Sequence, residues 1–339
     1  MAFMKKRTIF SILISILLIF TLAACSGERL ASFEKGSARS HVIPVGEYWY
    51  SVIGEYGKSE KQVSVSRAVD EINVVHSAEG GELSSFVASD GGCAWVEKND
   101  DGYFYYCYSL KNDKVKKICT SAAEDWQIQK IGISGETVYY AYVDYADSSA
   151  AIYSYDMASG KTAELCPLTY EAEATIDCLS VSGGYLSAVT LKGEGSVLLS
   201  VELATGKTDE IPLGDGVSRV FDVAFDSVTQ KRAFYFSDGS QEKIGVLDGG
   251  EMVTLTAFSP IQFAYRDEID FYDGKVYWVR ETTDTEPSEA KYVLVAYDHA
   301  SGDSDEYENV FFFNVNSNGL ITLNYDGKES FEKVDLFNY

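Results

Sequence analysis

The chain has 339 residues, with 28 Lys and Arg against 52 Asp and Glu, and its formal net charge is −24. This balance argues against nucleic-acid binding, because phosphate contacts require clustered Lys and Arg. The hydrophobic share of 46% is that of a globular protein, and the length allows a large core.

The first 24 residues have the layout of an export signal. Lys5, Lys6 and Arg7 precede an uncharged, mostly apolar run from residue 9 to residue 24. That run is shorter than the roughly 20 residues of a spanning helix. It ends in small residues, as secretory cleavage sites do. A membrane anchor that is never cut is the alternative at this point.

The residues at the end of this run are Leu22, Ala23, Ala24 and Cys25. They resemble the bacterial lipobox, the signal read by the lipoprotein-processing pathway. The resemblance implies that a signal peptidase recognises the first three residues and cuts before Cys25, whose thiol is acylated. It further implies a protein on the extracytoplasmic face of a bacterial cell membrane, held there by its lipid. Several acyl chains on one residue anchor stably, where a single chain holds only marginally.

These features divide the chain into three parts. We expect a lipoprotein signal peptide over residues 1–24, a short tether over 25–29 and one folded domain over 30–339. Five cysteines follow Cys25 in this domain, and none has the close spacing of a zinc or redox site. We expect free, buried thiols at Cys93, Cys107, Cys119, Cys166 and Cys178; a cross-strand Cys93–Cys107 disulfide is the alternative.

Short strand-like segments recur along the domain. Six of them open with glycine and one with Gln230, and successive starts lie 43 to 49 residues apart. The opening glycines are Gly46, Gly92, Gly135, Gly184, Gly274 and Gly319. A period of about 45 residues suits the four-stranded blade of propeller repeats.

Each repeat predicts an inner strand, the glycine-led second strand and an outer hairpin. Gly160, Gly206 and Gly302 stand where such a hairpin turn needs a positive φ. The C-terminal segment fits a third strand that lacks a fourth. Residues 29–36 could supply that fourth strand and close the ring. In the first repeat, residues 66–77 could instead form a short helix.

The sequence therefore predicts an all-β fold, a seven-bladed β-propeller of four-stranded antiparallel blades, with six or eight blades as alternatives. The repeat pattern is similar to bacterial propeller lipoproteins of the TolB-like and quinoprotein-like kinds. The chain shows no cofactor motif of the quinoproteins, so the resemblance implies no redox cofactor.

Three tryptophans occupy a similar place in their repeats. Trp49, Trp95 and Trp278 each fall a few residues into the glycine-led strand. Because repeated blades bury equivalent faces against each other, we expect these side chains to pack between blades. Trp126 is less regular and is expected at a loop surface or at the central channel.

Familiar catalytic motifs are missing from the sequence. The segments SGKT and TGKT lack the first glycine of a phosphate-binding loop, so no nucleotide is expected. His41, His76 and His299 lie in three different repeats without metal-ligand spacing, and His299 is expected to be a solvated turn residue. No nucleophile elbow is present.

Acidic segments follow several of the second strands. In an up-and-down blade the loops between second and third strands share one face, and scaffold loops often carry function. We therefore expect an acidic binding face that includes Asp100, Asp101, Asp144, Tyr145, Asp147, Asp238, Asp284 and Glu286, with Trp126 as a further candidate. No cofactor or metal is expected; a calcium ion on oxygen ligands in these loops is the alternative.

The leading functional prediction is a membrane-anchored, non-catalytic binding or scaffold platform for an envelope protein, a peptide or a glycan. One alternative is a hydrolase or lyase acting on polysaccharides, and another is a ligand-sensing subunit of a membrane complex. Fold alone does not decide among them. Carboxylates converging in a central pocket with aromatic walls would favour the enzyme. A shallow, open acidic face would favour the binder.

Overall fold

The computed structural model describes thirteen stretches of the chain, namely residues 28–32, 39–54, 61–69, 71–78, 82–121, 130–144, 146–170, 176–192, 195–258, 264–282, 291–317, 319–325 and 331–337. Within these stretches the chain forms 28 β-strands, which pair into seven four-stranded antiparallel sheets. Nowhere in them is there a helix long and apolar enough to cross a membrane.

We number the sheets in chain order and give the strands of each from the innermost outwards. Sheet 1 contains β2 (Arg39–Val45), β3 (Tyr48–Gly54), β4 (Lys61–Ser66) and β5 (Val74–Ser77). Sheet 2 contains β6 (Glu82–Ser89), β7 (Gly92–Asn99), β8 (Gly102–Ser109) and β9 (Lys114–Ser121). Sheet 3 contains β10 (Ile131–Ser134), β11 (Thr137–Asp144), β12 (Ser149–Asp156) and β13 (Thr162–Leu168). Sheet 4 contains β14 (Cys178–Ser182), β15 (Tyr185–Lys192), β16 (Gly195–Glu202) and β17 (Thr208–Pro212).

The remaining sheets follow the same plan. Sheet 5 contains β18 (Arg219–Asp226), β19 (Lys231–Ser237), β20 (Glu242–Asp248) and β21 (Glu251–Phe258). Sheet 6 contains β22 (Ala264–Tyr272), β23 (Lys275–Thr282), β24 (Lys291–Asp298) and β25 (Ser304–Glu308). Sheet 7 contains β26 (Val310–Asn316), β27 (Gly319–Tyr325), β28 (Phe331–Phe337) and, as its outermost strand, β1 (Glu28–Ser32).

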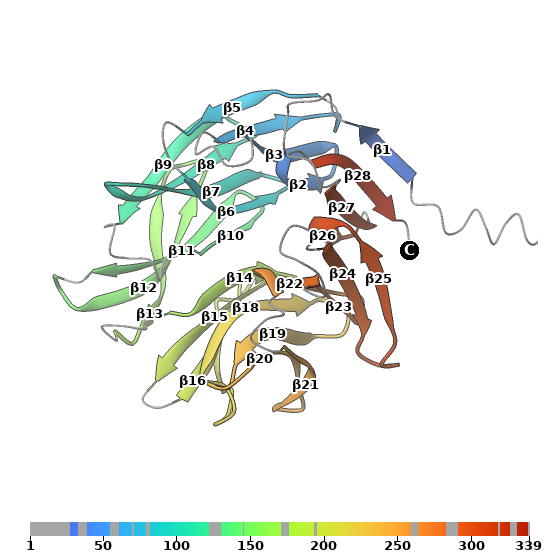
Figure 1. Cartoon of the computed structure of the whole chain (residues 1–339). Helices are drawn as coiled ribbons and strands as arrows, with labels where there is room; N and C mark the ends of the chain where they lie inside the picture. The colour runs from blue at the N-terminus through green and yellow to red at the C-terminus, as the bar shows by residue number, and fades with distance from the viewer. Residues whose placement is uncertain are drawn as a thin grey trace, which may run out of the picture.

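The sheets are arranged as a propeller. Their inner strands β2, β6, β10, β14, β18, β22 and β26 surround the middle of the molecule in chain order, and β26 lies against β2 (Figure 1). The expected all-β propeller of four-stranded antiparallel blades is thereby confirmed, as is the predicted order of inner strand, second strand and outer hairpin.

The ring is closed by strands from the two ends of the described chain. β1 pairs antiparallel with β28, with Glu28 opposite Leu336 and Ser32 opposite Lys333. Figure 1 shows β1 beside β28 at the outer edge of this sheet. The predicted closure is confirmed, and the strand takes Glu28 and Arg29 from the expected tether.

The alternative of a helix over residues 66–77 is wrong. A turn follows Ser66, and β5 then pairs with β4, with Val63 opposite His76. The outer edge of β4 carries backbone groups that need partners, and pairing with β5 satisfies them. This requirement outweighs the local pattern that allowed a helix.

Apolar clusters fill the junctions between neighbouring sheets. Trp95 is fully buried in a cluster that joins sheets 7, 1 and 2, and Trp278 is buried between sheets 5 and 6. Trp49 is partly buried against the first of these clusters. The prediction that the three tryptophans pack between blades is confirmed.

The described cysteines are free, and Cys119 is half-buried while the other four are buried. The alternative Cys93–Cys107 disulfide is wrong. Cys93 lies opposite Tyr108, whereas Cys107 lies opposite Ala94. Their side chains belong to clusters on opposite faces of sheet 2, since successive strand residues point to opposite faces.

Two faces of the ring are distinguished below. The hairpin face carries the turns that join first to second and third to fourth strands. The loop face carries the loops between second and third strands and the connections between sheets. On the hairpin face, the last residue of several inner strands bonds to the next sheet: Ser89 Oγ to Gly135 O at 2.7 Å, Ser182 Oγ to Phe225 O at 2.9 Å, and Asn316 Nδ2 to Pro44 O at 3.1 Å.

Candidate functional site

A cavity of about 710 Å³ occupies the middle of the ring, and inner strands of all seven sheets contribute to its wall. We call it the central cavity. Its lining residues cover much of the length of the inner strands and extend past their starts to Lys130, Ile176 and Ser218 on the loop side, whereas no described residue of the hairpin turns lines it. The cavity therefore reaches the loop face. Its volume is within the range of small-ligand sites in proteins.

The wall of the cavity carries groups of both charges. Four carboxylates line it, at Asp177, Asp222, Glu268 and Asp270. Lys130 and Arg219 also line it, together with His41. All four carboxylates come from sheets 4, 5 and 6, so the negative charge is concentrated on one side of the ring.

Three of these carboxylates bond to the backbone of the next sheet. An oxygen of Asp177 accepts from Val220 N at 3.0 Å, and an oxygen of Asp222 accepts from Ile269 N at 3.0 Å. The same contact recurs, at 3.5 Å, between Asp270 and Val315 N. The same carboxylate–backbone hydrogen bond thus joins each pair of consecutive sheets from 4 to 7, and it also fixes the positions of these carboxylates.

The position of Asp270 makes its ionisation costly. The pKa of Asp270 is raised to about 7, mainly by burial and to a lesser extent by the nearby carboxylates of Asp222 and Glu268, while the Val315 N–H opposes the shift. The side chain keeps partial exposure because it borders the cavity. Burial also raises the pKa of Asp177. A carboxyl that titrates near neutrality can donate or accept a proton at physiological pH.

The opposite side of the cavity carries aromatic side chains. Phe86 and Phe312 line it together with His41, whose ring centroid is 4.8 Å from that of Phe312 and 6.2 Å from that of Phe86. A ligand in the cavity would therefore meet aromatic rings on one side and carboxylates on the other.

The structure describes only some residues of the predicted acidic face. Asp144 ends β11 and Asp147 lies in the following loop, on the loop face as expected. Asp144 caps its own turn, accepting from Ala146 N at 3.0 Å and Asp147 N at 3.3 Å. Neither residue lines the central cavity. Capping of this kind is the ordinary role of Asp in turns.

Several predicted residues lie outside the described stretches. They are Leu22, Ala23, Ala24 and Cys25 of the lipobox, and Trp126, Tyr145, Asp284 and Glu286 of the binding face. Asp100, Asp101 and Asp238 are described, and all three lie in loops of the loop face. Asp238 caps its turn by accepting from Ser240 N and Gln241 N, each at 2.8 Å.

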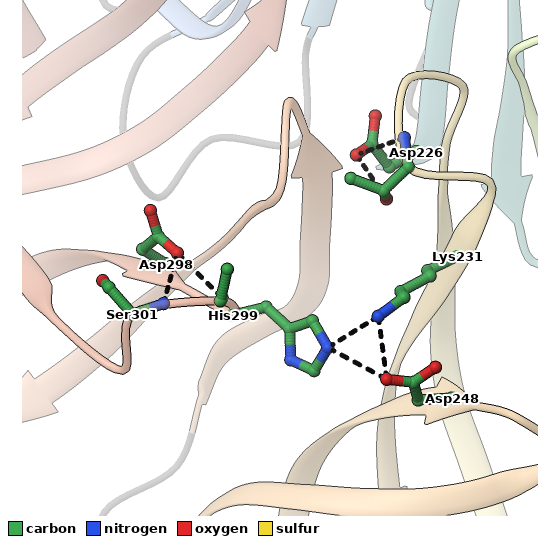
Figure 2. A network of polar contacts seen from close by, with 8 residues as sticks. Asp226, Lys231, Asp248, Asp298, His299 and Ser301 are labelled. Atoms are coloured by element: carbon green, nitrogen blue, oxygen red, sulfur yellow. Dashed lines mark hydrogen bonds and ion pairs between the residues drawn. The ribbon is translucent and has the colours of Figure 1, made fainter.

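The prediction that His299 is a solvated turn residue is wrong. Its side chain is only 16% exposed and lies between sheets 5 and 6 (Figure 2). Its Nε2 is 3.2 Å from Lys231 Nζ and 3.6 Å from Asp248 Oδ2, and Lys231 Nζ donates to Asp248 at 2.8 Å. The hairpin turn carries the histidine onto the neighbouring sheet, which a single repeat does not reveal.

His76 also joins two sheets. Its Nε2, on β5, lies 2.6 Å from Oε1 of Glu97 on β7. The same oxygen accepts a hydrogen bond from Trp95 Nε1 at 2.8 Å. The His76 ring packs on both Trp95 and Tyr106. Glu97 is buried, so this polar cluster stabilises the contact of sheets 1 and 2.

Among the His, Cys, Asp and Glu side chains that the structure describes, no group of three or more is placed to hold a metal ion.

The cavity carboxylates were not among the sequence candidates. One signal was present, since Asp177, Asp222 and Asp270 lie in or beside the inner strands of three consecutive repeats. Their spacing to the second strand differs, since Asp177 lies eight residues before the start of β15, Asp222 nine before β19 and Asp270 five before β23. No single repeat position therefore marks them.

No protein-family model and no curated protein matches this sequence. Solved structures do resemble the fold. The β-propeller domain of the Trilobed protease from Pyrococcus furiosus has a TM-score of 0.58 at 12% identity, covering 88% of this chain and 95% of that one. The acylaminoacyl peptidase of Pyrococcus horikoshii has a TM-score of 0.55 at 12% identity, covering 89% and 51%.

TolB from Acinetobacter baumannii has a TM-score of 0.51 at 13% identity, covering 78% of this chain and 64% of that one. This chain thus spans less than two thirds of the TolB chain. At such identities the likeness concerns the fold alone, and it supports a β-propeller body. Activities and partners do not transfer with the fold.

Proposed function

We propose that this protein is a non-catalytic binding platform of the bacterial cell envelope, anchored by an acylated Cys25, which holds a protein, peptide or glycan segment in its central cavity. We also propose that each of the seven sheets is one blade of the ring. The observation that carries the proposal is the cavity itself, a ligand-sized space walled by all seven sheets.

The arrangement of its wall supports binding. Three of the carboxyl groups, those of Asp177, Asp222 and Asp270, are held in place by backbone N–H groups, so a ligand meets them without their needing to reorganise. The aromatic side supplies apolar contact area. Propellers of the TolB kind are compatible with such a role.

A binding experiment tests whether the ligand occupies the central cavity. The soluble chain from residue 26 to 339 is screened against envelope glycans and peptides, and each hit is measured again with Asp222→Asn. The asparagine keeps an acceptor for Ile269 N but removes the charge. We expect at least tenfold weaker binding of a cationic hit. Charge reversal of Asp144 and Asp284 tests the loop face instead. Loss of binding in the loop variant alone would move the site out of the cavity.

The anchor has its own test. Cys25→Ala should leave the propeller folded, abolish lipid labelling and release or misprocess the protein. Labelling that persists in this variant would reject the acylation of Cys25.

A second candidate function is a polysaccharide hydrolase, which carboxylates in a central cavity with aromatic walls are expected to favour. We place it second because Asp177, Asp222 and Asp270 each accept a backbone N–H of the next sheet, a role that requires no catalysis. The observation that favours it is Asp270, whose raised pKa of about 7 suits a general acid, beside Asp222 and Glu268 in a cavity with aromatic walls. Product release from envelope polysaccharides, lost in Asp270→Asn, would establish the enzyme. A polysaccharide that binds without being cleaved would reject it in favour of the platform.

A further inference from the structure

The strand directions in sheet 7 decide on which face the N-terminal segment leaves the ring. Asn316 at the end of β26 lies opposite Gly319 at the start of β27, so their turn is on the hairpin face. β28 then runs toward this face, because Phe337 near its end lies opposite Leu320. β1 is antiparallel to β28. It therefore starts on the hairpin face and ends on the loop face.

The first residue of β1 fixes the attachment point of the anchor. Glu28 lies opposite Leu336, one residue before Phe337 at the end of β28. Cys25 precedes Glu28 by three residues. A fully extended segment of that length reaches about 10 Å. The eight residues of β12 span about 26 Å from one face to the other. The tether is therefore too short to bring the acylated residue to the loop face.

The central cavity reaches the loop face of the ring. Lys130, Asp177 and Ser218 precede the inner strands β10, β14 and β18 and line the cavity on that side, whereas no described residue of the hairpin turns lines it. On the hairpin side, the inner strands end in bonds between sheets, such as those of Ser182 and Asn316.

We infer that the propeller stands on the membrane with its hairpin face and turns its central cavity away from the bilayer, so that the site takes a water-soluble ligand from the aqueous side and not a lipid of its own leaflet. This inference rests on the acylation and the cavity binding proposed above. It adds an orientation and a solubility class for the ligand.

The orientation is measured on the full acylated protein in liposomes that contain an acceptor-labelled lipid. A donor dye is placed on Lys161→Cys, in the hairpin between β12 and β13, or on Ala146→Cys, in the loop before β12. Both native side chains are exposed and lie at opposite ends of the same strand. Ala300→Cys, exposed in the hairpin before β25, repeats the measurement on sheet 6. Dye bound to the unsubstituted protein reports on the native thiols.

We expect higher energy transfer from positions 161 and 300 than from position 146. Equal transfer from positions 161 and 146, or more from 146, would overturn the orientation. The mass of the N-terminal peptide from the same preparation separates the two proposals. If Cys25 is acylated and the order is reversed, only the orientation is wrong. If Cys25 carries no acyl chain, the anchor and the orientation both fail, and cavity binding stays subject to its own test.

Discussion

The carboxylate of Asp226 accepts a hydrogen bond from the backbone N–H of Gly274 at 2.9 Å, joining the hairpin turns of sheets 5 and 6. Asp226 is fully buried, and it also accepts from Asp273 N, Val228 N and both the N–H and the hydroxyl of Thr229. One side chain thus satisfies donors of two sheets. Figure 2 shows it near the Lys231 and His299 contact between the same sheets.

Asp226→Ala should lower the free energy of unfolding by about 3 kcal/mol, because it leaves several buried backbone N–H groups without an acceptor. Ser182→Ala is the matched control, since it removes a single bond to Phe225 O and should cost about 1 kcal/mol. Urea unfolding of the soluble chain measures both. Equal losses in the two variants would contradict the central role of Asp226.

The effect of Asp226 should depend on pH. Burial opposes its ionisation, but hydrogen bonds from Thr229, Val228 and Gly274 outweigh burial and lower the pKa of Asp226. A lowered pKa in the folded state stabilises the protein above the unfolded pKa of about 3.9. This contribution is lost as pH falls through the folded pKa. The stability difference between wild type and Asp226→Asn should therefore shrink below about pH 4; a difference constant from pH 6 to pH 3 would refute this.

Asp270 should act in the opposite sense. Its pKa is raised to about 7, above the unfolded value of about 3.9, so the folded protein holds a proton that the unfolded chain releases. Stability should therefore fall as pH rises from about 4 to 7. In Asp270→Asn this part of the pH dependence should disappear, with stability above pH 7 equal to or greater than that of the wild type. Unfolding curves at pH 5 and pH 8 test it, and an unchanged slope in the variant would reject the raised pKa.

The propeller fold could be predicted because the same turn recurs in the sequence at a regular spacing. Gly46, Gly135 and Gly274 all have positive φ in the turns that precede second strands. Because glycine adopts positive φ without steric cost, the repeated turn shows in the sequence as a repeated glycine. The closing strand was readable because the C-terminal segment lacked a fourth partner. The same reasoning placed Asp144 and Asp147 on the loop face.

The central cavity could not be predicted from the sequence, because its residues come together from different repeats. Asp222 bonds to Ile269 in the next sheet, and Asp177, Asp222 and Asp270 stand at different distances from the second strands of their repeats. His299 was misjudged for the same reason, since its partner Lys231 belongs to another repeat. Contacts between sheets depend on how the ring closes, which local sequence does not encode.

Two tryptophans in matching strands should differ in their cost of removal. Trp95 is fully buried and donates to the buried Glu97, whereas Trp49 is partly exposed at the edge of the same cluster. Trp95→Ala should therefore lower the free energy of unfolding by about 4 kcal/mol. Trp49→Ala should cost about half as much or less. Thermal and urea unfolding of both variants checks the order, and a larger loss in Trp49→Ala would contradict the packing.

The pairing of β1 with β28 should be needed for the stability of the whole ring. Ala31 lies within β1, opposite Val334, and Ala31→Pro fixes φ at about −65°, away from the extended backbone of an antiparallel strand. Glu28→Pro is the control, since proline is tolerated at the first residue of a strand. We expect Ala31→Pro to lower the free energy of unfolding by about 3 kcal/mol and to promote association through the freed edge of β28. Light scattering and urea unfolding report on both effects. If Ala31→Pro stayed monomeric and as stable as Glu28→Pro, the pairing of β1 with β28 would not be needed for the stability of the ring.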